Sequence, residues 1–184
     1  MQRDDEQLVF DYLNGDDNAL NILINRYLKH IYNFVYRFSR NIQDTEDISQ
    51  ETFFKVWKNL DKFKQGGKFK TWLFTIARNT AFDLLRKKRN FVFSDFENSD
   101  GDNFFEENIP DPEPLQDELV SKIEEKKILD DALYKISPLY REVLILHYHE
   151  QFTFDEIGKI LNKPLNTVKS QHRRGIVELK ILLT

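Results

Sequence analysis

The sequence contains no cysteine among its 184 residues. Without thiols the chain has no disulfide framework, no thiolate metal site and no cysteine nucleophile. Purely apolar stretches are only a few residues long, as at 143–146, which excludes a membrane-spanning helix. The first six residues are polar and acidic, unlike the basic and then apolar start of a signal peptide. These absences favour a soluble, cytoplasmic protein.

There is also little net charge, only −4, which argues against a uniformly basic surface for nucleic acid. The charges are, however, separated along the chain. Residues 62–90 carry nine basic and one acidic side chain, and residues 132–184 carry eight and five. Residues 91–131 carry three basic and fourteen acidic side chains. The small total therefore hides two basic segments, which are candidates for nucleic-acid contact, with an acidic segment between them.

The acidic stretch from about Ser94 to Glu118 holds three of the five prolines. Each proline removes an amide donor and disfavours helix in the residue before it, so this stretch is expected to be a flexible linker. It is either a solvated spacer or a charged segment that mimics nucleic acid or screens the basic surfaces. A chain of this length has a relaxed span of roughly 30 Å.

Apolar residues on both sides of the linker recur at intervals of three and four, which is the period of an amphipathic helix. No strand-like alternation of useful length occurs. The sequence predicts an all-α protein with two small helical domains, the second of them a helix-turn-helix. The expected helices span about 20–38, 43–60 (with Trp57 facing inward) and 70–88, then one up to about 135, one after Pro138, and two within 152–183.

Residues 152–183 have the pattern of a helix-turn-helix. Thr153 and Glu156 form a capping box that opens a helix. Gly158 costs that helix about 1 kcal/mol in propensity, so it marks a place where another part of the backbone passes closely. Asn162-Lys163-Pro164 makes the turn, and the next helix begins at about Asn166 with its inner face formed by Val168, Ile176, Leu179 and Leu183.

The outer face of this last helix is polar and basic. Such a stripe can reach base edges in the major groove, where Lys or Arg bonds guanine. The alternative is an ordinary surface helix with a few cations. The turn, the small residue and the stripe together favour DNA binding. The stripe consists of Asn166, Lys169, Ser170, Arg173, Arg174 and Val177.

The first domain presents two further surfaces. The helix at 43–60 has an acidic outer face, which by default is a solvated face. Residues 61–69 form a basic loop with Gly66-Gly67, followed by more cations. Aromatic residues among these cations are typical of single-strand binding, although Trp72 and Phe74 also fit a core. The aromatic residues are Phe63, Phe69, Trp72 and Phe74.

Three segments resemble the extracytoplasmic-function (ECF) sigma factors of bacterial RNA polymerase. They are TEDISQETF at 45–53, FKTWLFTIARN at 69–79 and TVKS at 167–170. They occur in that family's order and the resemblance covers nearly the whole chain. It implies sigma region 2 at 1–92, an acidic linker at 93–120 and a region 4 helix-turn-helix at 121–184.

The resemblance also implies residue roles and partners. Asp47, Gln50 and Glu51 would dock on the clamp helices of core RNA polymerase. Region 2 would open the minus-ten promoter element and hold an extruded base, which costs a few kcal/mol to flip. Region 4 would read the minus-thirty-five element as duplex. The implied minus-ten residues are Lys64, Lys68, Trp72, Arg78 and Asn79, and the implied minus-thirty-five residues are Asn166, Thr167, Lys169, Ser170, Arg173 and Arg174.

The family further implies an inhibitory anti-sigma partner, no cofactor, no metal and no catalysis. Two residues of the recognition helix depart from the family pattern. His172 stands where an apolar residue is usual, and Gly175 stands where alanine is usual. Both changes bear on the tilt of this helix.

Two other classes of protein remain as alternatives. A conventional helix-turn-helix regulator would leave the basic block at 62–90 and the acidic face around Asp47 without a role. A metal-dependent nuclease would have to take its carboxylates from the proline-containing acidic stretch, which cannot hold the fixed geometry of two-metal chemistry.

The linker suggests one more hypothesis. Two turns of DNA span about 70 Å, roughly twice the relaxed span of the linker. The free protein is therefore expected to bind promoter DNA poorly until polymerase holds the two domains apart.

Overall fold

The computed structural model describes residues 3–64, 66–92 and 127–183. We call residues 3–92 the N-terminal unit and residues 127–183 the C-terminal unit. Every regular element in these ranges is helical, as the sequence predicts. The predicted linker at 93–120 lies outside the described residues.

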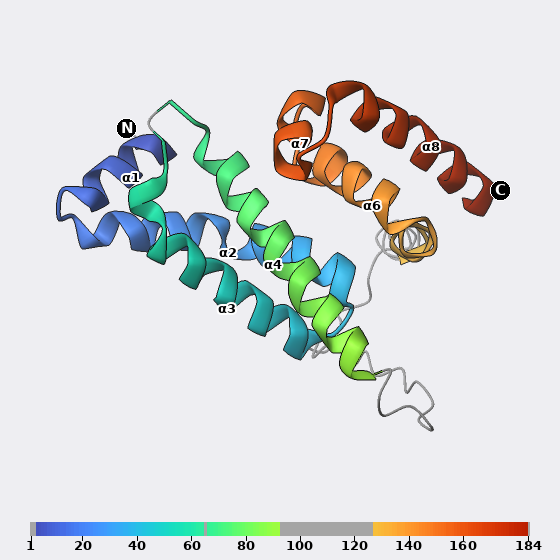
Figure 1. The fold of residues 1–184 in the computed structure, drawn as a ribbon, viewed down its shortest axis with the longest axis horizontal. Helices are drawn as coiled ribbons and strands as arrows, with labels where there is room; N and C mark the ends of the chain where they lie inside the picture. Colours follow the sequence, from blue (N-terminus) through green and yellow to red (C-terminus); the bar gives the residue numbers. More distant parts are fainter. Residues whose placement is uncertain (1–2, 65, 93–126, 184) are drawn as a thin grey trace, which may run out of the picture.

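The N-terminal unit is a bundle in which α2, α3 and α4 pack on one another and α1 packs mainly on α2 (Figure 1). Asparagine and aspartate side chains cap three of its helices, because their oxygens accept backbone N–H groups of the first turn. The elements are α1 (Asp5–Leu13), α2 (Asp17–Ser39), α3 (Ile42–Lys58), the 3-10 turn η1 (Leu60–Lys62) and α4 (Phe69–Val92).

The C-terminal unit begins with a helical segment at 127–135. Pro138 opens the next helix at its first position, where the missing N–H has no partner to lose. The following elements are α6 (Pro138–Leu144), the π-helical turn η2 (Ile145–His149), α7 (Phe154–Leu161) and α8 (Leu165–Leu183). The last two are the predicted helix-turn-helix.

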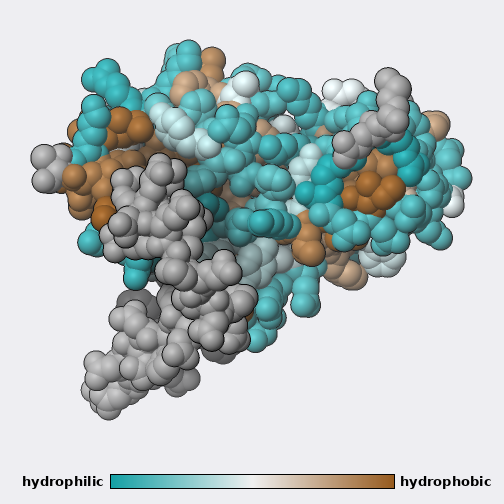
Figure 2. Space-filling model, turned by 180° about the vertical axis from the view of Figure 1, so that it is seen from behind, coloured by the Kyte–Doolittle hydropathy of each residue, from teal (hydrophilic) through white to brown (hydrophobic). Residues whose placement is uncertain are grey.

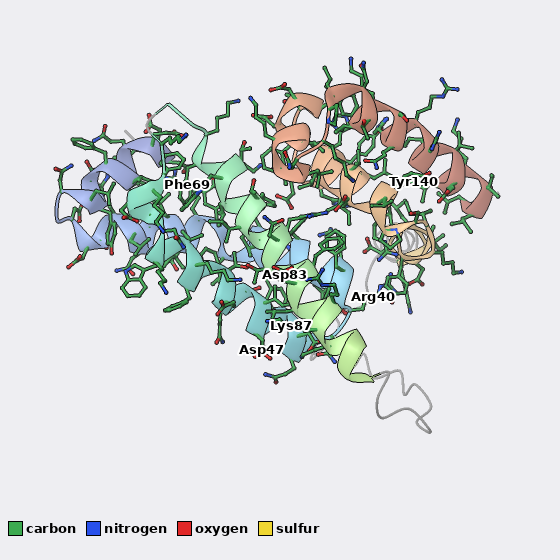
Figure 3. The ribbon with its side chains drawn as sticks, viewed as in Figure 1. Arg40, Asp47, Phe69, Asp83, Lys87 and Tyr140 are labelled. Atoms are coloured by element: carbon green, nitrogen blue, oxygen red, sulfur yellow. The ribbon has the colours of Figure 1, made fainter. Side chains whose placement is uncertain are left out.

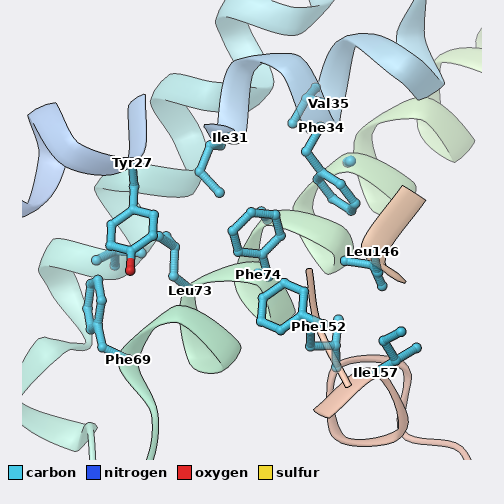
Figure 4. Packing of buried hydrophobic residues seen from close by; sticks show 14 of the residues in the cluster. Tyr27, Ile31, Phe34, Val35, Phe69, Leu73, Phe74, Leu146, Phe152 and Ile157 are labelled. Atoms are coloured by element: carbon cyan, nitrogen blue, oxygen red, sulfur yellow. The ribbon is translucent and has the colours of Figure 1, made fainter. Parts of the chain in front are cut away.

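One apolar core runs through both units. In the N-terminal unit Phe34, Leu73 and Phe74 are completely buried. The same cluster continues into the C-terminal unit through Phe152 and Ile157, so the units share buried surface (Figure 4). The helix α4 forms the side of the N-terminal unit that meets the C-terminal unit. It packs on α2 and α3 on one side and on α7 on the other (Figure 1).

The structure differs from the sequence prediction in two elements of the first unit. The helix α1 was not predicted, although it places Leu8 and Val9 in the core. Trp57, predicted to face inward, is 51% exposed. Val56 takes the buried position, and the next residue is turned about 100° around the helix from it. The indole N–H of Trp57 donates instead to the Tyr12 hydroxyl at 2.9 Å.

Two of the long helices also expose apolar residues to solvent. Leu183 of α8, which was predicted to face inward, is 47% exposed, and Leu28 of α2 is exposed to the same extent. The last turns of α8 extend beyond α6, so apolar side chains there face solvent. Figure 2 shows its largest apolar area at the end of the molecule that carries the C-terminus. The exposed residues of these turns are Val177, Ile181, Leu182 and Leu183.

Candidate nucleic-acid interface

The acidic face of α3 is open to solvent. Asp47 and Gln50 are exposed, and the Glu51 side chain is 42% exposed with its carboxylate 3.6 Å from the Lys55 ammonium. Spacings of three and four residues place the three on one side of the helix. In Figure 3, Asp47 lies near the start of α3, at the opposite end of the bundle from Phe69.

The same side of α3 continues into an aromatic pair that the sequence prediction missed. Phe54 and Trp57 are each 51% exposed, and their ring centroids lie 5.8 Å apart. Phe54 follows Gln50 by four residues and Glu51 by three, and Trp57 follows Gln50 by seven, which are helical spacings. The signal was available in the sequence as two large aromatic residues continuing a polar stripe.

Three of the five predicted minus-ten residues surround one hollow. Lys64, Lys68 and Trp72 line an open cavity of about 690 Å³ between the basic loop and the start of α7. Gly66 has a φ of 87°, a conformation that favours glycine and lets the loop turn. The Trp72 ring packs 5.4 Å from that of Phe63, which also lines the hollow.

The other two minus-ten residues lie farther along α4, outside this lining. The Arg78 guanidinium is stacked over the Phe82 ring, 4.5 Å from its centroid, and donates to the Asn79 side-chain oxygen at 3.3 Å. Its Nε and Nη2 both donate to the Glu142 carboxylate at 3.3 Å. Phe74, one of the aromatic residues among the predicted cations, is fully buried and belongs to the core.

Glu142 belongs to α6, so this ion pair joins the two units. Its side chain is completely buried, and its second oxygen accepts from Lys163 at 3.0 Å. The Lys163 ammonium also donates to the Gln171 side chain at 3.3 Å. A chain of polar contacts therefore runs from Arg78 on α4, through one buried carboxylate, to the recognition helix.

Two further contacts join α4 and its preceding loop to the C-terminal unit. The Lys68 ammonium lies 2.7 Å from the Glu156 carboxylate, and the Lys70 ammonium donates to the Glu150 carbonyl at 2.5 Å. Burial works against ionisation of Glu156. The hydrogen bonds from Lys68 and Thr153 nevertheless lower the pKa of Glu156 from 4.5 to about 2.

The helix-turn-helix has the geometry that the sequence predicts. The capping box is complete, since Thr153 and Glu156 each accept the other's backbone N–H. A Cβ on Gly158 would lie 2.8 Å from the Lys163 carbonyl oxygen, which explains the glycine. Asn162 ends α7 in the left-handed conformation, with φ of 51°.

All six predicted minus-thirty-five residues are exposed and lie in the N-terminal half of α8. None of their side chains has a hydrogen bond or an ion pair to another described residue. The Val168 side chain, on the opposite face, is completely buried and anchors the helix. The exposed residues are Asn166, Thr167, Lys169, Ser170, Arg173 and Arg174.

The two departures from the family pattern pack against the rest of the C-terminal unit. The His172 ring lies 5.0 Å from that of Phe154, and its Nε2 is 3.0 Å from the Tyr148 hydroxyl. Burial, and then the nearby His147, lower the pKa of His172 below 6.5. A Cβ on Gly175 would lie 3.1 Å from side-chain atoms of both Leu144 and Tyr140. The helices α8 and α6 therefore pack closely at this glycine, where a larger residue would crowd α6.

Among the described residues, no group of three or more His, Asp or Glu side chains is placed to hold a metal ion. The acidic stretch from Ser94 to Glu118, on which the nuclease alternative depends, lies outside the described residues. None of the helices in the described ranges has the length and apolarity needed to cross a bilayer.

Two family profiles match the chain in the same order as the two units. Sigma-70 region 2 matches residues 23–91, and Sigma-70, region 4 matches residues 126–179. The ECF RNA polymerase sigma factor SigW of Bacillus subtilis is 34% identical over 163 residues, which is 88% of this chain and 87% of SigW. This chain belongs to the ECF sigma factors.

Other relatives agree with this assignment. The ECF RNA polymerase sigma-E factor of Haemophilus influenzae is 30% identical, over 98% of this chain and 96% of its own length. The sigma factor RpoE of Bartonella quintana, solved in complex with the anti-sigma factor NepR, is 26% identical with a TM-score of 0.66. That match covers 89% of this chain and 95% of RpoE. As an ECF sigma factor, the chain directs promoter-specific initiation of transcription by RNA polymerase.

Proposed function

We propose that the two units divide promoter recognition between them, with α8 reading the minus-thirty-five element as duplex. The observation that carries this assignment is the row of six exposed side chains on α8 without partners among the described residues. Polar and basic groups at the start of a helix can reach base edges and phosphates in the major groove. The assigned residues are Asn166, Thr167, Lys169, Ser170, Arg173 and Arg174.

The minus-ten element is assigned to the basic loop and α4. The N-terminal wall of the hollow, formed by the basic loop and Trp72, offers an aromatic surface and two lysines, which fits an extruded base with its phosphates. Lys64 and Lys68 would hold the strand there, and Arg78 and Asn79 would continue the contact along α4. Because Arg78 and Asn79 lie outside the hollow, they contact neighbouring nucleotides rather than the extruded base.

Core RNA polymerase is assigned to the open face of α3. Asp47, Gln50 and Glu51 offer carboxylate and amide oxygens to the basic clamp helices of the polymerase. Phe54 and Trp57 extend this face with apolar surface. Aromatic side chains beside a polar rim are typical of the residues that dominate binding at protein interfaces.

The proposal includes the wider organisation of the protein. Sigma region 2 would occupy 1–92, the linker 93–120 and region 4 121–184. The chain would act in the cytoplasm, catalyse no reaction, and need neither cofactor nor metal. An anti-sigma partner is supported by the relative RpoE, which was solved in complex with the anti-sigma factor NepR.

Transcription in vitro tests this function directly. Core polymerase and the chain, given genomic fragments, should initiate at specific sites. The variant Arg173→Ala/Arg174→Ala should lose at least about 30-fold in initiation, because each base contact is worth about 1–3 kcal/mol. The control Lys29→Ala, which removes an exposed cation of α2, should retain activity. Equal activity of both variants would exclude α8 as the reader of the minus-thirty-five element.

A further inference from the structure

The three candidate surfaces differ in one respect in this arrangement of the two units. The acidic face of α3 and the polar stripe of α8 are open, but Lys68 and Arg78, two of the five minus-ten residues, are paired to carboxylates of the C-terminal unit. The groups assigned to the melted strand are therefore partly occupied by another part of the same chain.

The occupying groups resemble phosphates in their chemistry. Lys68 meets the Glu156 carboxylate at 2.7 Å, and Arg78 donates two N–H groups to the Glu142 carboxylate. Lysine and arginine bind carboxylate and phosphate oxygens through the same charge-assisted hydrogen bonds. The two carboxylates and a nucleic-acid strand therefore compete for these cations.

The Lys68 side chain is 74% exposed, so its pair with Glu156 contributes little by itself and the apolar part of the contact matters. The Phe74 and Phe152 rings meet edge to face at 5.1 Å, and both side chains are buried. Leu146 and Ile157 surround them from the C-terminal unit (Figure 4). This contact gives the ion pairs a buried centre that fixes the two units against each other.

Glu142 is suited to a contact that opens. It is held from one side by Arg78 and from its own unit by Lys163. When the units separate, Lys163 still neutralises the carboxylate, so opening does not leave a buried charge without a partner. The ion pair between Glu142 and Lys163 therefore holds the turn of the helix-turn-helix both when the units are together and when they are apart.

We propose that this arrangement is a self-inhibited state in which Glu142 and Glu156 compete with the minus-ten strand for α4 and its preceding loop. The inference rests on the proposed function of Lys68 and Arg78. It implies an order of events, because polymerase can engage α3 and duplex can engage α8 while the units remain together. The melted strand binds only after the C-terminal unit leaves α4.

The strength of this inhibition follows from the open fraction, since the apparent dissociation constant is the intrinsic one divided by that fraction. If about a tenth of the molecules are open, full opening raises the affinity for single-stranded DNA about tenfold. Duplex bound through α8 gains nothing. The two kinds of DNA therefore report on the two surfaces separately.

The test uses the full chain with Glu142→Gln/Glu156→Gln. Glutamine preserves size and can still serve the capping box at Glu156. The matched control is Asp17→Asn/Glu178→Gln, which makes the same change in net charge; Asp17 is exposed on α2, and Glu178 accepts a hydrogen bond within the C-terminal unit. Binding of a short fluorescent single strand of mixed sequence, and of its duplex, is measured by anisotropy.

The absence of cysteine allows a second readout. Spin labels at Lys58→Cys on α3 and Ile181→Cys on α8, both exposed positions, report the distance between the units. We expect one narrow distance distribution in the parent and a broad one in the Glu142→Gln/Glu156→Gln variant. Its affinity for the single strand should rise about tenfold, with duplex affinity equal to that of the matched control.

Two results would overturn the inference: an unchanged distance distribution, or separated units with no gain in single-strand affinity over the control. Adding Arg78→Ala to the opened variant tests the proposed function separately. If opening raises single-strand affinity but Arg78→Ala does not lower it, the inhibition stands and the assignment of Arg78 to the minus-ten strand fails.

Discussion

The cations of α8 and those of α4 have the same side-chain chemistry but different surroundings. Arg173 and Arg174 are exposed and make no ion pair within the described residues. Arg78 is stacked on one ring and paired to a buried carboxylate, and Lys68 is paired to Glu156. A basic residue in a nucleic-acid-binding segment is therefore not automatically available to nucleic acid.

The difference arises from how many faces each helix buries. The helix α8 packs on α6 and α7, and its opposite face is left to solvent. The helix α4 contacts α2 and α3 on one side and α7 on another. Phe74, one turn after Lys70, points to that second contact. Where α4 faces the second unit, its cations Lys70 and Arg78 both have partners there.

The largest effect is expected when one arginine is removed from each helix and the free energy of unfolding is measured. Arg78→Ala should lower it by about 1–3 kcal/mol, because the buried Glu142 carboxylate loses charged hydrogen bonds and keeps only Lys163. Arg173→Ala should change it by less than about 0.5 kcal/mol, as for other exposed residues. Urea unfolding followed by circular dichroism gives both values.

Arg78→Lys serves as a control for this test, because a lysine retains the charge but not the two-donor geometry. It should recover part of the loss. Equal effects of Arg78→Ala and Arg173→Ala would show that the contact between α4 and α6 contributes nothing to stability in solution.

The sequence predicted the parts of this comparison that depend on local pattern. The period of three and four gave α2, α3 and α4, and the capping box and Gly158 gave the helix-turn-helix, all confirmed. It did not give α1, whose Leu8 and Val9 lie in a short, charged segment, or the exposed position of Trp57. Helical period says which side of a helix is apolar but is ambiguous at the edge of the stripe.

The contact between the units was beyond the reach of the sequence for a different reason. Phe74 and Phe152 each fit the inner face of their own unit, so neither required a partner in the other. The acidic residues that pair with α4 are single carboxylates spread over α6 and α7, and no run or motif sets them apart. The net charge of residues 132–184 is positive, so the charge count gave no sign that a buried carboxylate in this segment, Glu142, pairs with the other unit.

A smaller effect should come from acid. The pKa of Glu156 is about 2 in the folded chain against 4.5 ordinarily, so its ionised form stabilises the fold fully above pH 4.5. This stabilisation is lost as the pH falls from 4.5 toward 2. Lys68→Met removes the partner in the other unit but leaves Thr153, so its stability should fall less over this range. Thermal unfolding at several pH values measures the difference, and identical profiles would mean that the Thr153 cap alone lowers the pKa.

The smallest effect concerns His172, where α8 itself is partly packed. Because burial and the neighbouring His147 lower the pKa of His172 below 6.5, the folded unit favours the neutral ring and the unfolded chain binds the additional proton. Stability should therefore decrease as the pH falls through 6.5. His172→Phe can retain the ring contacts with Phe154 and Tyr148 but loses the hydrogen bond to the Tyr148 hydroxyl and cannot titrate, so its stability should depend less on pH in this range. Urea unfolding on both sides of pH 6.5 compares the two chains. A steeper dependence in the variant would mean that the protonated ring is stabilised in the fold, and the recognition helix would then be held by a charge as α4 is.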